Sequence, residues 1–279
     1  MADEATRKKY KQLIKNGFCI FDQVLDPTML DRVRMVSDQL LNRQSQAHFR
    51  EQKSTGSMVS VFDDVFFAEL VSYPPALSIL FRLGFDQPIW SSGYIISKPP
   101  GSPALFWHQD WWGWNHPCSY KPIPQQIFLM YYLADTTKKN GCLRVISGSH
   151  LKRHPMHNHV DKAHTDELRS MVDPEHPAYQ PVEGELDIPV KAGDLVIGDS
   201  RLLHAAHGNS SDYRRTVITL WYLPLYYQLP EPIQAFVGRN VLPEKWLNSD
   251  VGQIKPLTAV YKGCEEPIVW NRTPSSALK

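Results

Sequence analysis

The chain has 279 residues, with 30 Lys and Arg against 29 Asp and Glu, so its formal net charge is +1. This balance gives no indication of a nucleic-acid or membrane-surface partner, because such partners select basic surfaces. A small-molecule partner fits the composition better. The four cysteines are scattered without a CxxC pair, which argues against a zinc knuckle or a dense disulfide framework and favours reduced thiols.

The N-terminus is charged and lacks the apolar stretch of a signal peptide, and no apolar run reaches the roughly 18 residues of a membrane span. We therefore predict a cytoplasmic protein without a membrane span. Hydrophobic residues make up 42% of the chain and 22 residues are proline, which favours a sizeable core with many turns and few long helices. We see no domain boundary and expect one domain over residues 1–279; no pattern indicates an oligomeric state.

The first predicted elements form a helical layer at the front of the chain. Residues 10–15 fit a short helix, and residues 17–25 alternate like a strand. Asp26 and Pro27 then form a helix-entry signal, because Asp caps free N–H groups and Pro suits the first turn. Apolar residues follow at helical spacing as far as Leu41.

From Met58 onward, short apolar segments recur between turn signals. Most are rich in the β-branched and aromatic residues that are typical of strands. These segments cover residues 60–70, 89–97, 104–112, 126–134, 142–147, 195–199 and 216–223. The pattern predicts a mainly β body, either a barrel or a sandwich.

The region of about residues 150–190 differs from this pattern because it is rich in Pro and Gly and has few apolar runs. We interpret it as a long insertion carrying one short helix, and insertions of that length are often lids or binding loops. Its histidines could close over a site or bind a metal, while a solvated loop is the simpler interpretation; they are His154, His157, His159 and His164. The tail after Pro224 is also rich in Pro and polar residues.

The segment FWHQDWW places His108 and Asp110 two residues apart. On a strand, this spacing points both side chains to the same face. A third metal ligand must come from elsewhere, and the segment after the strand that ends at Asp199 offers His204 or His207. Two histidines and one carboxylate leave positions open on an iron, an arrangement that suits non-heme Fe(II) oxygenases.

Two arginines follow at a spacing that suits a cosubstrate with two carboxylates. Such a molecule needs a fixed cation at its far end, and Arg pairs bidentately with a carboxylate. Arg214 and Arg215 follow His204 by ten and eleven residues and open the predicted strand 216–223. That strand would run back beside the metal and carry an arginine to the buried end of the cosubstrate.

Four sequence blocks occur in one order along the chain. They are PPG at 99–101, WHQD at 107–110, NGCLRVISGSH at 140–150 and AGDLVIGDSRLLHAAHGNSSDYRRTVITLWY at 192–222. On these blocks the chain resembles the phytanoyl-CoA dioxygenase family over most of its length. The ordered set is far more specific than an HxD pair alone.

The resemblance implies a double-stranded β-helix, or jelly roll, with flanking N-terminal helices and a long loop insertion. It implies Fe(II) held by His108, Asp110 and a distal histidine, with 2-oxoglutarate as cosubstrate. The family's Asn and Ser a few residues after the distal histidine favour His204 over His207.

The resemblance also implies a cosubstrate site with an arginine downstream of the distal histidine. Similarity of the strand that follows favours Arg214, whereas strict spacing favours Arg215; we prefer Arg214. The family contacts the cosubstrate from neighbouring strands as well, and Tyr94, Gln126 and Trp221 are the residues that we expect in this role.

The implied activity is oxidation of a small molecule by O2, with release of succinate and CO2. Specialised metabolism is the setting that we expect for it. Hydroxylation is the expected outcome, while desaturation and cyclisation stay open because they begin with the same hydrogen abstraction. Asp110 argues against the halogenating relatives, in which a small residue replaces the carboxylate. Trp111, Trp112 and Trp114 could wall an apolar or ring-bearing substrate or pack in the core.

Other interpretations of these residues explain less. His108 as a core histidine and Asp110 as a turn cap would leave the ordered blocks unexplained. Gly141 is expected to mark a hairpin with positive φ, and Asp199 to be a turn residue rather than a ligand. A non-catalytic metal-binding jelly roll predicts a damaged triad or a lost arginine. A cupin-type isomerase or hydrolase predicts more histidine ligands and no carboxylate-binding arginine.

Overall fold

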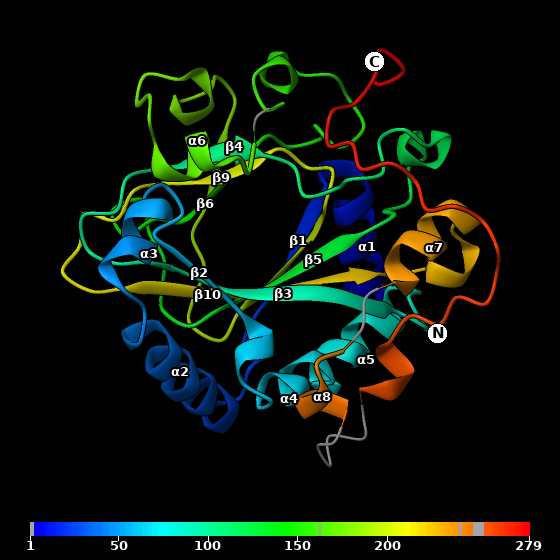
Figure 1. The fold of residues 1–279 in the computed structure, drawn as a ribbon, viewed down its shortest axis with the longest axis horizontal. Helices are drawn as coiled ribbons and strands as arrows, with labels where there is room; N and C mark the ends of the chain where they lie inside the picture. The colour runs from blue at the N-terminus through cyan, green and yellow to red at the C-terminus, as the bar shows by residue number, and fades with distance from the viewer. Residues whose placement is uncertain (1–2, 162, 240–241, 248–253) are drawn as a thin grey trace.

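The computed structural model describes residues 3–161, 163–239, 242–247 and 254–279. Its strands form two antiparallel sheets that face each other in Figure 1, with β4, β9 and β6 opposite β3 and β10. The larger sheet has the order β1-β8-β5-β10-β3-β2 and the smaller one β4-β9-β6-β7. This arrangement confirms the predicted mainly β, jelly-roll architecture.

The bounds of the elements follow the predicted segments closely. The larger sheet contains β1 (Phe18–Phe21), β2 (Ser57–Ser60), β3 (Ile89–Lys98), β5 (Ile127–Tyr132), β8 (Leu195–Asp199) and β10 (Arg215–Leu223). The smaller sheet contains β4 (Leu105–His108), β6 (Leu143–Val145), β7 (Leu186–Ile188) and β9 (His204–Ala206). The helices are α1 (Glu4–Asn16), α2 (Pro27–Asn42), α3 (Gln46–Glu51), α4 (Phe67–Val71), α5 (Pro74–Arg82), α6 (Asp166–Ser170), α7 (Glu231–Gly238) and α8 (Glu244–Leu247).

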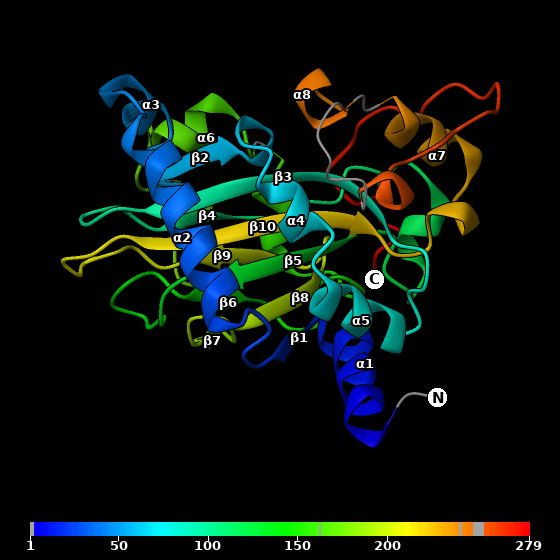
Figure 2. The same cartoon turned by 90° about the horizontal axis from the view of Figure 1, so that it is seen from below.

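The front helical layer is present as predicted. The Asp26 side chain accepts a hydrogen bond from the backbone N of Met29 at 2.9 Å and so caps α2. Helix α1 is longer than the predicted 10–15 because Asp3 caps it six residues earlier, accepting from Thr6 N at 2.7 Å. In Figure 2, α2 lies across the strands of the larger sheet.

The prediction of a strand over residues 60–70 was wrong. Strand β2 ends at Ser60, and the chain continues through a short 3-10 helix over Val61–Asp63 into α4. The side chains of Ser60 and Asp64 accept hydrogen bonds from the backbone N of Phe62 and Phe66, at 3.2 and 2.9 Å. These local side-chain bonds turn the chain and outweigh the strand propensity of its Val and Phe residues.

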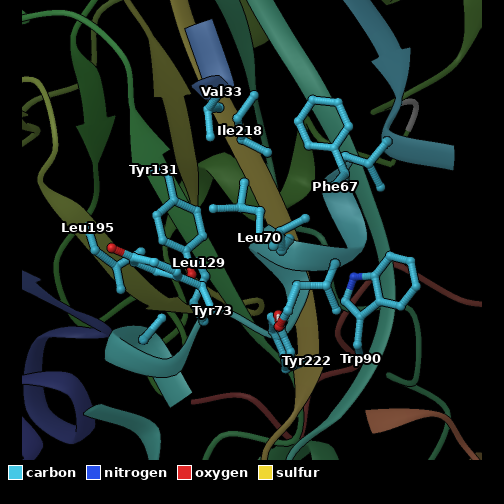
Figure 3. Close-up of a cluster of buried hydrophobic side chains, with 14 of the residues drawn as sticks. Val33, Phe67, Leu70, Tyr73, Trp90, Leu129, Tyr131, Leu195, Ile218 and Tyr222 are labelled. Carbon is cyan, nitrogen blue, oxygen red and sulfur yellow. Dashed lines mark hydrogen bonds between the residues drawn. The ribbon is translucent and has the colours of Figure 1, made fainter. Parts of the chain in front are cut away.

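The main hydrophobic core lies between the larger sheet and its covering helices. Figure 3 shows Val33 of α2 and Phe67 of α4 pointing at Tyr131 of β5 and Ile218 of β10. On β10, the even-numbered residues from Ile218 face this core, while Val217, Thr219 and Trp221 face the interior of the jelly roll. The helices therefore cover one face of the larger sheet and leave the other to line a cavity.

The insertion and the tail are more ordered than the sequence suggested. The insertion holds α6 as its one α-helix, and it ends in β7, which pairs with β6 through Leu143 and Ile188. The tail crosses back to the segment after β4, where Asn271 N donates to the carbonyl of Trp112 at 2.8 Å. Among the described residues, no helix has the length and apolar character needed to cross a membrane.

Candidate active site

Three buried side chains converge at one end of the smaller sheet. His108 on β4 lies opposite His204 on β9, and Asp110 follows directly after β4. The Nε2 atoms of His108 and His204 lie 3.7 and 3.6 Å from the two carboxylate oxygens of Asp110. One ligand atom of each residue lies within 4.8 Å of the other two, so the three can hold one metal ion.

Backbone carbonyls fix the orientation of both imidazoles. The Nδ1 of His108 donates to the carbonyl of Phe106 at 2.9 Å, and the Nδ1 of His204 donates to that of Leu202 at 3.0 Å. Because a carbonyl only accepts, Nδ1 carries the proton and Nε2 keeps its lone pair toward Asp110. The strand geometry thus prepares each ring to ligate through Nε2.

The carboxylate and the charge state of His108 also suit a metal. The Nε1 of Trp221 donates to Oδ2 of Asp110 at 2.9 Å and holds the carboxylate in place. Burial, reinforced by the neighbouring His204, lowers the pKa of His108 to about 3, so its imidazole is neutral near pH 7. Two neutral imidazoles and one carboxylate are the donor set of the facial iron triad, and the residues present fit it.

The sequence of the chain is similar to that of a known protein family. A sequence profile described as phytanoyl-CoA dioxygenase (PhyH) matches residues 13–217. The chain belongs to this family. The match includes all three converging residues and both candidate arginines.

Individual members of the family are more distant. Phytanoyl-CoA dioxygenase 1 of Oryza sativa subsp. japonica is 31% identical over 170 residues, which are 59% of this chain and 55% of the relative. A probable alpha-ketoglutarate-dependent hypophosphite dioxygenase of Stutzerimonas stutzeri is 29% identical over 130 residues, which are 46% of this chain and 42% of the relative. The chain therefore matches only about half the length of these two curated relatives.

Solved structures of other proteins share the fold of this chain. The non-heme alpha ketoglutarate-dependent epimerase SnoN from nogalamycin biosynthesis superposes with a TM-score of 0.59 at 17% identity, covering 78% of this chain and 83% of SnoN. SnoN has also been crystallised in complex with Fe3+, alpha ketoglutarate and nogalamycin RO. At this identity the likeness concerns the fold alone.

The structure does not bring the preferred Arg214 to the triad. Its side chain points out of the jelly roll toward α2, where it lies 3.2 Å from Asp38 and 3.0 Å from the side-chain oxygen of Asn42. Neighbouring residues on a strand face opposite sides, so Arg215 points inward. Arg215 is buried and its Nε has no hydrogen-bond partner. Arg214, which the sequence analysis preferred, therefore faces away from the triad, and Arg215 takes the inward position.

A single cavity joins Arg215 to the triad. We call it the inner cavity; it is lined by Lys98, Arg215, His108, Asp110 and His204 together with apolar residues of both sheets. Lys98 was not predicted from the sequence. It lies opposite Arg215 in the pairing of β3 with β10 and is fully buried. Burial and the neighbouring charge of Arg215 lower the pKa of Lys98, and burial lowers that of Arg215. The guanidinium of Arg215, with the amine of Lys98 beside it, favours an anion at this end of the cavity.

Of the other expected cosubstrate residues, two line a different cavity from Arg215. Tyr94 and Gln126 line a second cavity on the far side of Asp110 rather than the inner cavity. Trp221 borders both cavities, and its indole N–H is occupied by Asp110. Gln126 donates to Ser91 at a long 3.4 Å, and its Oε1 is buried without a partner.

The remaining aromatic and histidine candidates differ in whether they lie in the core, border a cavity or reach the triad. Trp111 and Trp114 are buried in a core cluster, and Trp112 of that cluster also borders the second cavity. His207 lies 2.5 Å from Asp187 and points away from the triad. The structure therefore selects His204 as the residue that meets Asp110.

One histidine of the insertion reaches the triad. The Nε2 of His164 lies 3.8 Å from Oδ1 of Asp110, and its ring centroid is 4.7 Å from that of His108. His164 adopts a left-handed backbone conformation with φ of 68°, and its buried Nε2 has no hydrogen-bond partner. The simpler interpretation as a solvated loop does not describe this residue. No local sequence signal separates it from His154, His157 or His159, because its placement depends on how the insertion folds back.

Proposed function

We propose that the chain is an Fe(II)- and 2-oxoglutarate-dependent oxygenase that oxidises a small organic molecule with O2. In this proposal His108, Asp110 and His204 bind the iron. The observation that carries it is the inner cavity, which is lined both by the three converging residues and by the buried Arg215 with Lys98 beside it. A molecule that chelates a metal and carries a second carboxylate fits both groups of residues.

The residues of this chain have distinct tasks in the proposed reaction. The carbonyls of Phe106 and Leu202 hold the two imidazoles in the ligating tautomer, and Trp221 orients Asp110. When bound, Fe(II) with 2-oxoglutarate supplies the oxidation of a substrate C–H bond by O2, with succinate and CO2 as coproducts. The buried walls of both sheets exclude water from this chemistry.

Arg215 is the proposed partner of the distal carboxylate of 2-oxoglutarate. A guanidinium forms two parallel hydrogen bonds with a carboxylate, and the unpartnered Nε of Arg215 is free to donate one of them. Lys98 lies beside Arg215, and its Nζ donates to the carbonyls of Ser54 and Pro103 at 2.7 and 2.5 Å. The buried hydroxyl of Thr219, also without a partner, lines the same cavity and can donate to the ligand.

The range of the relatives guides the finer assignment. Similar proteins are named a hypophosphite dioxygenase, a phytanoyl-CoA dioxygenase and an ectoine dioxygenase, and SnoN is an epimerase. We propose hydroxylation as the reaction, with desaturation and cyclisation as variants of the same hydrogen abstraction, in specialised metabolism. We further propose a single catalytic domain over residues 1–279 and a cytoplasmic location, where its four free cysteines would stay reduced.

Succinate formation tests the proposal directly. The purified protein, loaded with Fe(II) under O2, is expected to convert 2-oxoglutarate slowly to succinate even without substrate. His108→Ala should lose metal binding by more than about 100-fold, because changes to groups behind the ligands already cost roughly 10- to 100-fold. Metal content and succinate are measured on the same samples.

His207→Ala is the matched control, since His207 was the alternative distal ligand and lies outside the triad. It should keep both metal and succinate formation. Bound iron without any binding of 2-oxoglutarate in the absence of O2 would favour a non-catalytic jelly-roll protein. Loss of metal in His207→Ala but not in His204→Ala would overturn the assignment of the triad.

A further inference from the structure

The second cavity, on the far side of Asp110, is larger than the inner one. We call it the outer cavity; its volume is about 570 Å³, within the range of roughly 300–1,000 Å³ that is usual for small-molecule sites. It shares Asp110, His164 and Trp221 with the inner cavity. A molecule in the outer cavity would therefore lie beside the triad while 2-oxoglutarate occupies the inner cavity.

Arg272 of the C-terminal tail lines the outer cavity with unused donors. Its Nε and Nη1 are buried without a hydrogen-bond partner, and no ion pair of Arg272 is found within the described part of the chain. Its guanidinium carbon lies 4.7 Å from the ring centre of Trp270, and the adjacent Asn271 is paired with the backbone of Trp112. The tail thus holds a charged side chain in place without supplying its counter-charge.

Arg169 of α6 brings a second guanidinium to the same cavity. One of its Nη atoms donates to the carbonyl of His164, the other lies 3.7 Å from the exposed Asp166, and its Nε is buried without a partner. Burial lowers the pKa of Arg272, Asp110 opposes this and Arg169 adds to it, so these charges interact. Arg272 remains charged at neutral pH despite this lowering, because the ordinary pKa of Arg lies far above neutral pH.

The cavity holds no carboxylate that can neutralise Arg272. Among the described residues that line it, Asp110 is the one acidic side chain. Asp110 belongs to the proposed metal site, already accepts from Trp221, and would have its charge balanced by the ion. Since Arg169 has Asp166 beside it, one unit of positive charge is left uncompensated. This matches a ligand with a single negative charge.

Aromatic side chains next to Arg272 form another part of the lining of the outer cavity. Trp112 packs against Phe236 of α7 with ring centres 4.2 Å apart and lies nearly parallel to Trp270 at 6.0 Å. Such a wall suits an apolar or ring-bearing group, because flat hydrocarbon surfaces pack closely on indole rings. The cavity therefore combines a cationic end with an apolar face.

We propose that the outer cavity binds the substrate and that this substrate is an organic monocarboxylic acid. Its carboxylate pairs with Arg272, supported by Arg169, and its apolar body lies against Trp112 and Phe236. The inference rests on the proposed function, because it takes the molecule beside the triad to be the one oxidised. It names the class of the substrate and makes Arg272 a specificity-determining residue.

The test compares an acid with its own neutral amide, 1-naphthylacetate and 1-naphthylacetamide. Binding is measured by calorimetry on the full protein with Fe(II) and saturating 2-oxoglutarate in the absence of O2, so no turnover is needed. The acid should bind at least about 10-fold more tightly than the amide. Arg272→Gln should weaken binding of the acid by roughly 10- to 100-fold and leave binding of the amide unchanged.

Two control variants separate the possible explanations. Arg82→Gln removes an exposed arginine at the end of α5, beside Asp3, and should change neither affinity. Arg215→Met should weaken binding of 2-oxoglutarate but not binding of the acid. Equal affinities for acid and amide, no binding of the acid up to millimolar concentration, or loss of the acid in Arg215→Met but not in Arg272→Gln would each overturn the proposal.

The same titrations keep this inference distinguishable from the proposed function. If the oxygenase assignment failed, 2-oxoglutarate would not bind, whereas the preference for acid over amide would persist and still depend on Arg272. If the inference failed, 2-oxoglutarate would bind and depend on Arg215, but the acid would show no preference.

Discussion

Two buried arginines, Arg201 and Arg215, differ in what surrounds them. Arg201, just after β8, is fully buried. Its Nε and Nη2 pair with the carboxylate of Asp199 at 2.9 and 2.5 Å, and its Nη1 donates to the carbonyls of Ser119 and Lys121 at 2.7 and 2.6 Å. This arginine ties the chain around residues 119–123 to the end of β8.

Arg215 is nearly as buried, with 3% of its surface exposed, but its Nε has no partner and it lines the inner cavity beside Lys98. A buried charge without hydrogen bonds or a counter-ion costs stability. The contrast teaches how to separate structural from ligand-binding arginines in this fold. The structural one is satisfied by the protein, and the binding one is left for a ligand to satisfy.

The largest effect is expected from breaking the satisfied site. Asp199→Asn leaves the Arg201 charge buried without its carboxylate, which should lower the free energy of unfolding by about 3–5 kcal/mol. Urea denaturation followed by circular dichroism measures this change. A loss below about 1 kcal/mol would mean that Arg201 is held by the carbonyls alone.

Removing the unsatisfied arginine should have the opposite pattern. Arg215→Met should leave the free energy of unfolding unchanged or slightly raised, because an uncompensated charge is replaced by an apolar side chain. Its affinity for 2-oxoglutarate should fall by roughly 30-fold or more, equivalent to at least about 2 kcal/mol. Calorimetry with Fe(II) in the absence of O2 gives the affinity.

The neighbouring arginine provides the matched control. Arg214→Met removes a surface side chain that contacts Asp38 and should change stability and 2-oxoglutarate affinity by less than about 1 kcal/mol. If Arg214→Met lost 2-oxoglutarate and Arg215→Met did not, the inward and outward assignments on β10 would have to be exchanged.

A smaller effect is expected from crowding Arg215 through Gly141. Gly141 has φ of 93°, as predicted for this hairpin, and an added Cβ would lie 2.9 Å from the carbonyl of His207 and 3.5 Å from the Nε of Arg215. Gly141→Ala should cost roughly 1–2 kcal/mol of stability from backbone strain. It should also weaken 2-oxoglutarate, which calorimetry would detect.

Gly84→Ala separates strain from crowding. Gly84 has a similar φ of 89°, but an added Cβ would meet no atom within 4 Å. It should lose similar stability and keep full affinity for 2-oxoglutarate. Equal affinities in the two alanine variants would show that crowding at Gly141 does not reach Arg215.

The parts of the site that could be predicted from sequence are those encoded by local geometry. His108 and Asp110 are two residues apart at the end of a strand, and that spacing alone turns them to one side. The helix caps at Asp26 and the positive φ at Gly141 are similarly local. Asp199, expected as a turn residue, accepts a hydrogen bond from the backbone N of Arg201 at 2.9 Å.

The choice between Arg214 and Arg215 depended on register, which local sequence does not give. A shift of one residue exchanges the two faces of a strand. The register of β10 is set by its pairing with β3, where Arg215 lies opposite Lys98, more than a hundred residues earlier. Similarity of the following strand could not supply that information.

Lys98 and Arg272 escaped prediction for a related reason, and His164 was not separated from the other histidines of the insertion. Each comes from a different region, and no periodic pattern links a strand end, a long insertion and a Pro-rich tail. Arg272 reaches the outer cavity because Asn271 pairs with the backbone beside Trp112, a contact between distant segments. Such contacts are fixed by tertiary packing, and only the folded chain reveals them.

The sheet order carries a consequence for how the protein folds. Strand β1 pairs with β8, so Phe18 lies beside Gly198 and the chain must close a loop of nearly its whole catalytic region before that contact forms. Pairings this remote in sequence slow folding, because the chain loses conformational entropy before any contact compensates for it. Until β1 docks, β8 is an unpaired edge that another chain can extend. Variants that lack residues 1–20 should therefore aggregate during refolding, even though no active-site residue is removed.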